Sequence, residues 1–218
     1  MNKAFIFDMD GVLVDSERAW EGKEHKLLAN IFGDNFARNL DNTLIGTSIR
    51  DTYEQASAKG TSVSYEMFKE RYDEMAQKVL ASAKITDGLN AIGQYLIKMN
   101  YKLGLVSSSP RNWIDLVLPR VPFHNNIEVI ISLTDFVHLR RKPKPDGYLE
   151  ALKQLDAEAS MSIILEDSNP GIQSAKASGC YVIGFRGNLV TSYKQTGADV
   201  YADTMGEVMR LVEEFTRQ

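Results

Sequence analysis

The sequence is poor in the residues that cross-link a chain or bind zinc. Its 218 residues include one cysteine, Cys180, and three histidines. A single thiol excludes an internal disulfide framework and a cysteine-based zinc site, and we expect it to be a small buried residue. The histidines, His25, His124 and His138, stand alone without the spacing of metal ligands. The chain therefore offers neither a disulfide framework nor a histidine or cysteine metal site.

Long apolar runs and an excess of basic charge are also absent. No apolar run approaches the roughly 18 residues that span a membrane. The formal net charge is −4, so neither nucleic acid nor an anionic membrane is an expected partner. The chain enters an apolar segment at once, without the basic segment and long apolar stretch of a signal peptide. We expect a cytoplasmic protein, and a monomer because no feature demands an assembly.

Short apolar segments, each followed by a turn and a segment of helical period, recur along the chain. The predicted strands are residues 4–7, 101–106, 128–131, 161–165, 181–185 and, more weakly, 198–202. Helices are predicted over 110–118, 146–155, 170–178 and 204–216. Continuously apolar strands that alternate with helices predict an α/β fold, a Rossmann-like parallel sheet with helices on both faces.

The segment 16–83 breaks this alternation because it carries only helical signals. Ser16 is expected to cap a helix that carries Trp20 and extends to Ile31, and Ser64 to cap another. An inserted all-α domain that begins just after an aspartate pair would cover the end of the first strand. We therefore predict a helical cap domain over 16–83, a core domain formed by 1–15 and 84–218, and hinges near 14–17 and 82–88.

Polar residues follow four of the predicted strands. In open parallel sheets, ligands bind beyond the carboxyl ends of the strands, so these residues are expected to converge. They are Asp8, Asp10 and Gly11 after the first strand, Ser107–Ser109 after the second, Arg140–Pro145 about ten residues after the third, and Glu166–Asn169 after the fourth.

Each of these clusters alone also fits a simpler interpretation. Asp10–Gly11 between apolar residues is a strong hairpin signal. Ser107–Ser109 before Pro110 could be only the start of a helix. Residues 140–145 fit a solvated loop or a basic localisation signal, and Glu166–Asp167 could merely complement a helix dipole. The shared position of all four clusters favours a common site.

The combined cluster predicts phosphoryl chemistry. Asp8 and Asp167 would repel one another unless a cation lay between them, and oxygen ligands suit Mg²⁺. Ser107, the N–H groups that open the helix at Pro110, and a lysine predict a phosphate site. One carboxylate can then attack phosphorus, while a second protonates the leaving oxygen and later deprotonates water.

Four motifs at these positions resemble the motifs of the haloacid dehalogenase-like (HAD) hydrolase superfamily, in the same order. They are D-x-D-G-V-L-V-D-S at 8–16, V-S-S-S at 106–109, K-P-x-P-D at 142–146 and E-D-S-x-x-G-I at 166–172. The resemblance covers essentially the whole chain. It is greatest to the β-phosphoglucomutase-like phosphatases, which carry a helical (C1-type) cap after the first motif.

The resemblance implies a role for both aspartates of the first motif. Asp8 would be the nucleophile and a Mg²⁺ ligand. Asp10 would be the general acid and base, with its main-chain carbonyl on the metal. Dehalogenating members lack an aspartate at the position of Asp10, so its presence favours phosphoryl transfer.

The other motifs imply the phosphate and metal partners. Ser107, Ser108 and Lys142 would bind the phosphoryl group, and Asp167 would complete the metal shell. Glu166 would be a further ligand or a partner behind the ligands. Lys144 fits the third motif less well and is expected to be a flanking residue.

The expected function is Mg²⁺-dependent hydrolysis of a small phosphate ester, most readily a sugar phosphate, through an aspartyl phosphate. A β-phosphoglucomutase is the alternative, but mutase-like sequences carry a histidine at the position of Trp20 and an arginine one residue before Arg50. Trp20 either contacts substrate or packs in the cap. Arg50 either grips a distal substrate group or faces solvent. Nucleotide monophosphates, phosphoglycolate and pyrophosphate stay open as substrates, and a catalytically idle binding relative is the remote alternative.

Overall fold

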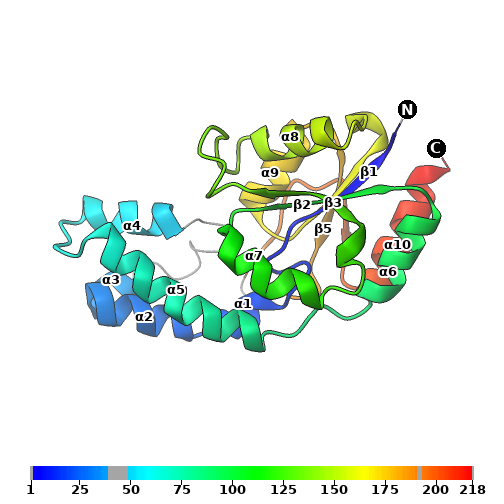
Figure 1. Ribbon diagram of the computed structural model, residues 1–218. Coiled ribbons are helices and arrows are strands. Elements are labelled where there is room, and N and C mark those ends of the chain that lie inside the picture. Colours follow the sequence, from blue (N-terminus) through cyan, green and yellow to red (C-terminus); the bar gives the residue numbers. More distant parts are fainter. Residues whose placement is uncertain (1, 39–48, 191–192, 218) are drawn as a thin grey trace.

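A computed structural model describes residues 2–38, 49–190 and 193–217 and contains one six-stranded sheet (Figure 1). Its strand order is β3-β2-β1-β4-β5-β6, and every neighbouring pair is parallel. The strands are β1 (Ala4–Phe7), β2 (Lys102–Ser107), β3 (Ile127–Ser132), β4 (Ile163–Glu166), β5 (Tyr181–Phe185) and β6 (Val200–Ala202). The predicted parallel α/β sheet is confirmed.

The central strand β1 is buried on both faces. Phe5 and Phe7 pack into one apolar core and Ala4 and Ile6 into the other, and all of them are inaccessible to solvent. Burial on both faces explains the continuous apolar run in the sequence. Because both neighbours of β1 run parallel to it, the hairpin interpretation of Asp10–Gly11 is wrong.

Helices cover both faces of the sheet, as predicted (Figure 1). One face carries α8 (Asp146–Gln154) and α9 (Asn169–Ala177). The other carries α6 (Leu89–Lys98), α7 (Arg111–Val117) and α10 (Met205–Thr216). Short 3₁₀ turns lie at Leu118–Arg120, His124–Asn126 and Ala159–Met161. The last of these explains why β4 begins two residues after its predicted start.

Helix α6 was not among the predicted helices. Its N-cap is Gly88, in the left-handed conformation with φ 86°, and no side chain caps the helix. The start of α6 therefore lacks the Ser, Thr, Asp or Asn cap that marks a helix in a sequence.

The remaining helices form a body beside the sheet (Figure 1), which we call the helical body. It consists of α1 (Ser16–Trp20), α2 (Lys23–Phe32), α3 (Asp34–Arg38), α4 (Ile49–Ala58) and α5 (Tyr65–Ser82). As predicted, the Ser64 side chain caps α5, accepting from the Met67 N–H at 3.2 Å. The exact extent of the cap domain, residues 16–83, stays a prediction.

The first predicted helix of the helical body is wrong in two respects. The chain forms two helices, α1 and α2, because Gly22 between them adopts a left-handed φ of 68°. Ser16 is also not the N-cap, which is Asp15. The Ser16 hydroxyl instead accepts a hydrogen bond from the Gly11 N–H at 3.1 Å, which ties α1 to the loop after β1.

The two connections between the helical body and the rest of the molecule run side by side. The Asp15 N–H donates to the Lys84 carbonyl at 2.8 Å, and the Thr86 N–H donates to the Leu13 carbonyl at 3.1 Å. Val14 and Ile85 form an antiparallel bridge between these bonds. Whether these segments act as hinges stays a prediction.

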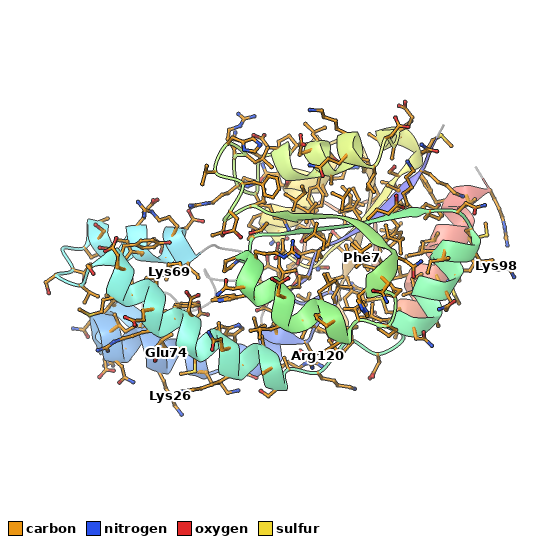
Figure 2. The ribbon with its side chains drawn as sticks, viewed as in Figure 1. Phe7, Lys26, Lys69, Glu74, Lys98 and Arg120 are labelled. Atoms are coloured by element: carbon orange, nitrogen blue, oxygen red, sulfur yellow. The ribbon has the colours of Figure 1, made fainter. Side chains whose placement is uncertain are left out.

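The helical body also packs directly on α7. The Tyr72 and Trp113 rings are nearly parallel with centroids 5.8 Å apart, and Trp113 Nε1 donates to Asp73 Oδ1 at 2.8 Å. Figure 2 shows Phe7 in the interior and Arg120 near the end of α5, where its guanidinium donates to the Leu80 carbonyl at 2.7 Å. Across the described residues, no helix is long and apolar enough to cross a membrane.

Candidate active site

The carboxyl ends of β1, β2 and β4 form the edge that we call the site edge. Asp8 and Asp10 follow β1, Ser107 ends β2, and Glu166 ends β4. Asp8, Ser107 and Glu166 are buried there, and carboxylates such as Asp8 and Glu166 are rarely buried unless they are paired.

Lys142 reaches the site edge from the loop before α8. Its side chain is 3% exposed, and Nζ donates to Asp8 Oδ1 at 2.6 Å and also to Glu166 Oε1. Burial alone would lower the lysine pKa, but the adjacent carboxylates of Asp8 and Glu166 raise it above its usual value. The lysine is therefore charged, and the solvated-loop interpretation is wrong for Lys142, although the neighbouring Lys144 is exposed.

Glu166 is inaccessible to solvent, and both of its carboxylate oxygens accept hydrogen bonds. Oε1 accepts from the Tyr148 hydroxyl at 2.7 Å as well as from Lys142. Oε2 accepts from the N–H groups of Asp167 at 3.1 Å and Ser168 at 3.2 Å. These donors favour Glu166 as an anchor for Lys142 over Glu166 as a direct metal ligand. Tyr148 was not identified from the sequence.

The carboxylates of Asp8, Glu166 and Asp167 form a buried cluster whose oxygens lie within 4.8 Å of one another. Asp167 Oδ2 is buried without a hydrogen-bond partner. Burial, reinforced by the charge of Asp8, raises the pKa of Asp167 well above its usual value. An unpartnered oxygen in a cluster of hard oxygen ligands is what a divalent cation would satisfy. The residues at the site edge therefore fit a metal ion.

Gly11 makes room for the Asp167 carboxylate. It has φ +70°, and a Cβ at this position would lie 1.9 Å from Asp167 Oδ2. A larger residue would both strain the loop after β1 and displace Asp167. The glycine of the D-x-D-G motif is thus explained by the approach of the motif-four aspartate.

Asp10 is held by Ser109, the member of the Ser107–Ser109 cluster to which no role was assigned from the sequence. Ser109 Oγ donates to Asp10 Oδ2 at 2.7 Å, and the Ser109 N–H donates to Ser107 Oγ at 2.9 Å. Burial raises the pKa of Asp10, and the hydrogen bond from Ser109 partly offsets this rise. The signal for Ser109 was its place as the third serine of V-S-S-S.

The predicted anion site at the start of α7 needs one correction. The Arg111 N–H donates to Asp135 Oδ2 at 2.6 Å, so this helix-opening group already has an acidic partner. Ser107 remains at the site edge. Ser108 is half-buried, and its carbonyl accepts from the Thr134 hydroxyl at 2.7 Å. Pro110 is the N-cap residue of α7 and not its first helical residue, and no side chain caps this helix.

The two predicted cap residues make contacts within the protein. The Trp20 ring lies 5.3 Å from that of Tyr72 and 6.2 Å from that of Trp113, which favours packing. Arg50 pairs with Glu54 at 3.1 Å and stacks over Tyr65 on the surface. Residues 46–48, which precede Arg50 in the segment compared with the mutase-like sequences, lie outside the described residues.

Glu17 of α1 was not singled out from the sequence. Burial, reinforced by the charges of Asp10 and Glu24, raises the pKa of Glu17 to about 8. The helical body therefore brings a carboxyl group into the electrostatic field of the site edge.

Known proteins resemble this chain in sequence and in fold. Residues 5–185 match the model of the haloacid dehalogenase-like hydrolases. Validoxylamine A 7'-phosphate phosphatase of Streptomyces hygroscopicus subsp. limoneus is 31% identical over 189 residues, 84% of this chain and 85% of that protein. Beta-phosphoglucomutase of Bacillus subtilis is 29% identical over 195 residues, 84% of this chain and 82% of that protein.

Solved structures give the same fold. CbbY from Rhodobacter sphaeroides, solved in complex with phosphate, superposes with a TM-score of 0.77 at 19% identity, covering 95% of this chain and 96% of that one. The family match spans all four motifs, from the aspartate pair after β1 to the acidic pair at the end of β4. The chain therefore belongs to the haloacid dehalogenase-like hydrolase family.

Proposed function

We propose that this protein is a Mg²⁺-dependent phosphatase that hydrolyses a small phosphorylated metabolite, most readily a sugar phosphate. The enzyme class predicted from the four motifs, a HAD-like phosphatase, is confirmed by the family match and by a relative that is named a phosphatase. The observation that carries the proposal is the buried contact between Asp8 and Lys142, beside the unpartnered carboxylate oxygen Oδ2 of Asp167.

The proposed reaction begins with Asp8. Its carboxylate oxygen attacks phosphorus and forms an aspartyl phosphate as the bond to the leaving oxygen breaks. Asp10, whose pKa is raised by burial, gives its proton to that oxygen and later takes a proton from the water that hydrolyses the intermediate. Ser109 holds the Asp10 carboxyl group during both steps.

The charges around Asp8 suit a phosphoryl group. Lys142 and Ser107 would bind its oxygens, with Ser108 beside them. Mg²⁺, held by Asp8, Asp167 and the main-chain carbonyl of Asp10, would supply the positive charge that offsets the transferring phosphoryl group. Glu166 would keep Lys142 in place, because both of its oxygens already accept protein hydrogen bonds.

Contacts of Trp20 favour hydrolysis over the mutase alternative. A mutase has to protect its phosphoenzyme from water, and mutase-like sequences carry a histidine at this position of the cap. Here the indole is packed against Tyr72 and Trp113. A sugar phosphate is favoured as substrate class by similarity to a phosphatase of a 7'-phosphate and to a phosphoglucomutase.

Phosphate release tests the proposal directly. The purified protein is incubated with Mg²⁺ and an aryl phosphate, and then with a panel of phosphorylated metabolites. We expect phosphate release that EDTA stops, and we expect Asp8→Asn to abolish it in a protein that still folds. A wild type that hydrolyses no member of the panel would overturn the phosphatase assignment.

A second incubation separates hydrolysis from isomerisation. The protein is given β-glucose 1-phosphate with a trace of the corresponding bisphosphate, and both products are measured. Hydrolysis predicts free phosphate. Glucose 6-phosphate that accumulates without free phosphate would establish the mutase instead.

A further inference from the structure

The segment after β5 binds the loop that carries Asp167. Gln195 Nε2 donates to the Asp167 carbonyl at 2.5 Å and to the Phe185 carbonyl at 2.8 Å. The Tyr193 hydroxyl accepts from the Asn169 N–H at 2.6 Å, and the Thr196 N–H donates to Asn169 Oδ1 at 2.8 Å. These contacts join residues 193–196 to the loop after β4, although Gln195 and Asp167 are 28 residues apart in the sequence.

Asp167 depends on its main chain for position. Its carboxylate oxygen Oδ2 has no hydrogen-bond partner within the protein. Its N–H donates to Glu166 Oε2 at 3.1 Å, and its carbonyl accepts from Gln195 on the other side. These two bonds hold, from both sides, the stretch of main chain from which the carboxylate projects.

Gln195 fits this role closely. Its side chain is buried, and one amide nitrogen bridges the carboxyl ends of the adjacent strands β4 and β5. A Cβ on Gly184 of β5 would lie 3.0 Å from Gln195 Oε1. The side-chain amide of Gln195 is thus packed closely against β5. Gln195 Oε1 is buried without a hydrogen-bond partner, and burying an unpaired oxygen costs free energy of folding.

We propose that Gln195 is a positioning residue for the metal ligand Asp167. The inference rests on the proposed Mg²⁺-dependent function. Groups that orient metal ligands from behind typically change metal affinity by about 10- to 100-fold when they are removed. Gln195 would act in this way through the Asp167 main chain, without touching substrate or metal.

The test is Mg²⁺ binding to Gln195→Met, which keeps the length of the side chain but removes the donor. Calorimetry on the protein without substrate gives the Mg²⁺ dissociation constant, and we expect it to rise about tenfold or more. The Mg²⁺ concentration for half-maximal hydrolysis of an aryl phosphate should rise in parallel, while saturating Mg²⁺ restores most of the maximal rate.

Ser162→Ala is the matched control. Ser162 is also buried, and its hydroxyl accepts from the Ala4 N–H at 2.9 Å and donates to the Glu158 carbonyl at 2.7 Å, at the opposite end of the strands. This variant should lose stability while its Mg²⁺ dissociation constant stays at the wild-type value. Wild-type Mg²⁺ affinity in Gln195→Met would overturn the inference.

The Mg²⁺-binding test can still be carried out if Gln195→Met does not fold. If Gln195→Met does not fold, the smaller polar variant Gln195→Asn carries the same measurement, with the same rise expected and the same unchanged value contradicting it. The two proposals also fail separately. A wild type that neither binds Mg²⁺ nor releases phosphate contradicts the proposed function, whereas a Mg²⁺-binding wild type with unchanged Gln195 variants contradicts the role of Gln195 alone.

Discussion

The site edge and the helical body differ in the kind of side chain that they bury. At the site edge, Lys142 lies buried between Asp8 and Glu166, and its ammonium group donates to both. Where the helical body meets α7, the buried contacts are the aromatic rings of Tyr72 and Trp113. Buried charges need particular partners at particular distances, whereas aromatic packing tolerates other shapes of similar volume. The site edge therefore depends on specific ion pairs, whereas the contact of the helical body with α7 depends on aromatic packing.

Asp10→Asn should give the largest loss among variants that keep the nucleophile. Without its general acid, we expect hydrolysis to slow by about 10²–10⁴-fold. The loss should be greatest for an alkyl phosphate, whose leaving oxygen most needs a proton, and smaller for a nitrophenyl phosphate. Steady-state kinetics on both substrates checks this, and an equal loss on both would contradict the acid role.

Lys142→Met tests whether the site edge depends on paired charge. We expect roughly a 10²–10³-fold loss of turnover, as for removal of a group that stabilises transition-state charge. Stability should also fall by about 3–5 kcal/mol, because Asp8 and Glu166 lose the cation between them. Kinetics and urea unfolding measure the two effects. The exposed Lys144→Met is the control and should match the wild type in both.

Trp20→Leu tests the other half of the comparison. We expect a loss of about 2 kcal/mol in the free energy of unfolding, because the ring contacts with Tyr72 and Trp113 disappear. Hydrolysis of an aryl phosphate should be nearly unchanged, and Arg50→Ala should stay within about 0.5 kcal/mol of the wild type. A selective rise in KM for the sugar phosphate would show instead that Trp20 contacts substrate.

Glu17→Gln tests a residue of the helical body whose pKa is raised by burial and by the charge of Asp10 at the site edge. The folded-state pKa of Glu17 is about 8 against an ordinary value of 4.5, so between these pH values the folded protein binds more protons than the unfolded one. The free energy of unfolding must then fall as the pH rises from 4.5 to 8. The variant should exceed the wild type by about 1–2 kcal/mol at pH 8 and match it near the lower limit.

Urea unfolding at several pH values measures this difference. A constant gap between Glu17→Gln and the wild type would contradict the raised pKa. Glu17 would then not respond to the charges at the site edge.

The residues of the site edge were predictable where they directly follow a predicted strand or stand in a recognised motif. Asp8 and Asp167 directly follow strands, so the parallel order of the sheet was enough to bring them together, whereas Lys142 was identified through the resemblance of K-P-x-P-D to the third motif. Ser109 was expected at this edge but was given no role, and Tyr148 was missed, because a serine or a tyrosine has many possible partners. Their bonds to Asp10 and Glu166 depend on the register of the chain in space.

Local signals failed where tertiary contacts decide the outcome. Ser16 has the sequence signature of an N-cap, but its hydroxyl accepts from Gly11 instead. Helix α6 has no side-chain cap at its start, and its buried face packs on α10 and the sheet. Gln195 lies in a loop whose sequence carries no motif, so only its contact with the Asp167 carbonyl reveals it.

The paired crossings at Asp15 and Lys84 have a consequence for how such a molecule diversifies. The helical body leaves and re-enters the remainder of the chain at points joined by a 2.8 Å hydrogen bond. Because the two crossings are adjacent, a different insertion at this junction would start and end at the same place and would leave the order of the six strands unchanged. The ends of β1, β2 and β4 would then keep their positions while the helical body beside the sheet changes.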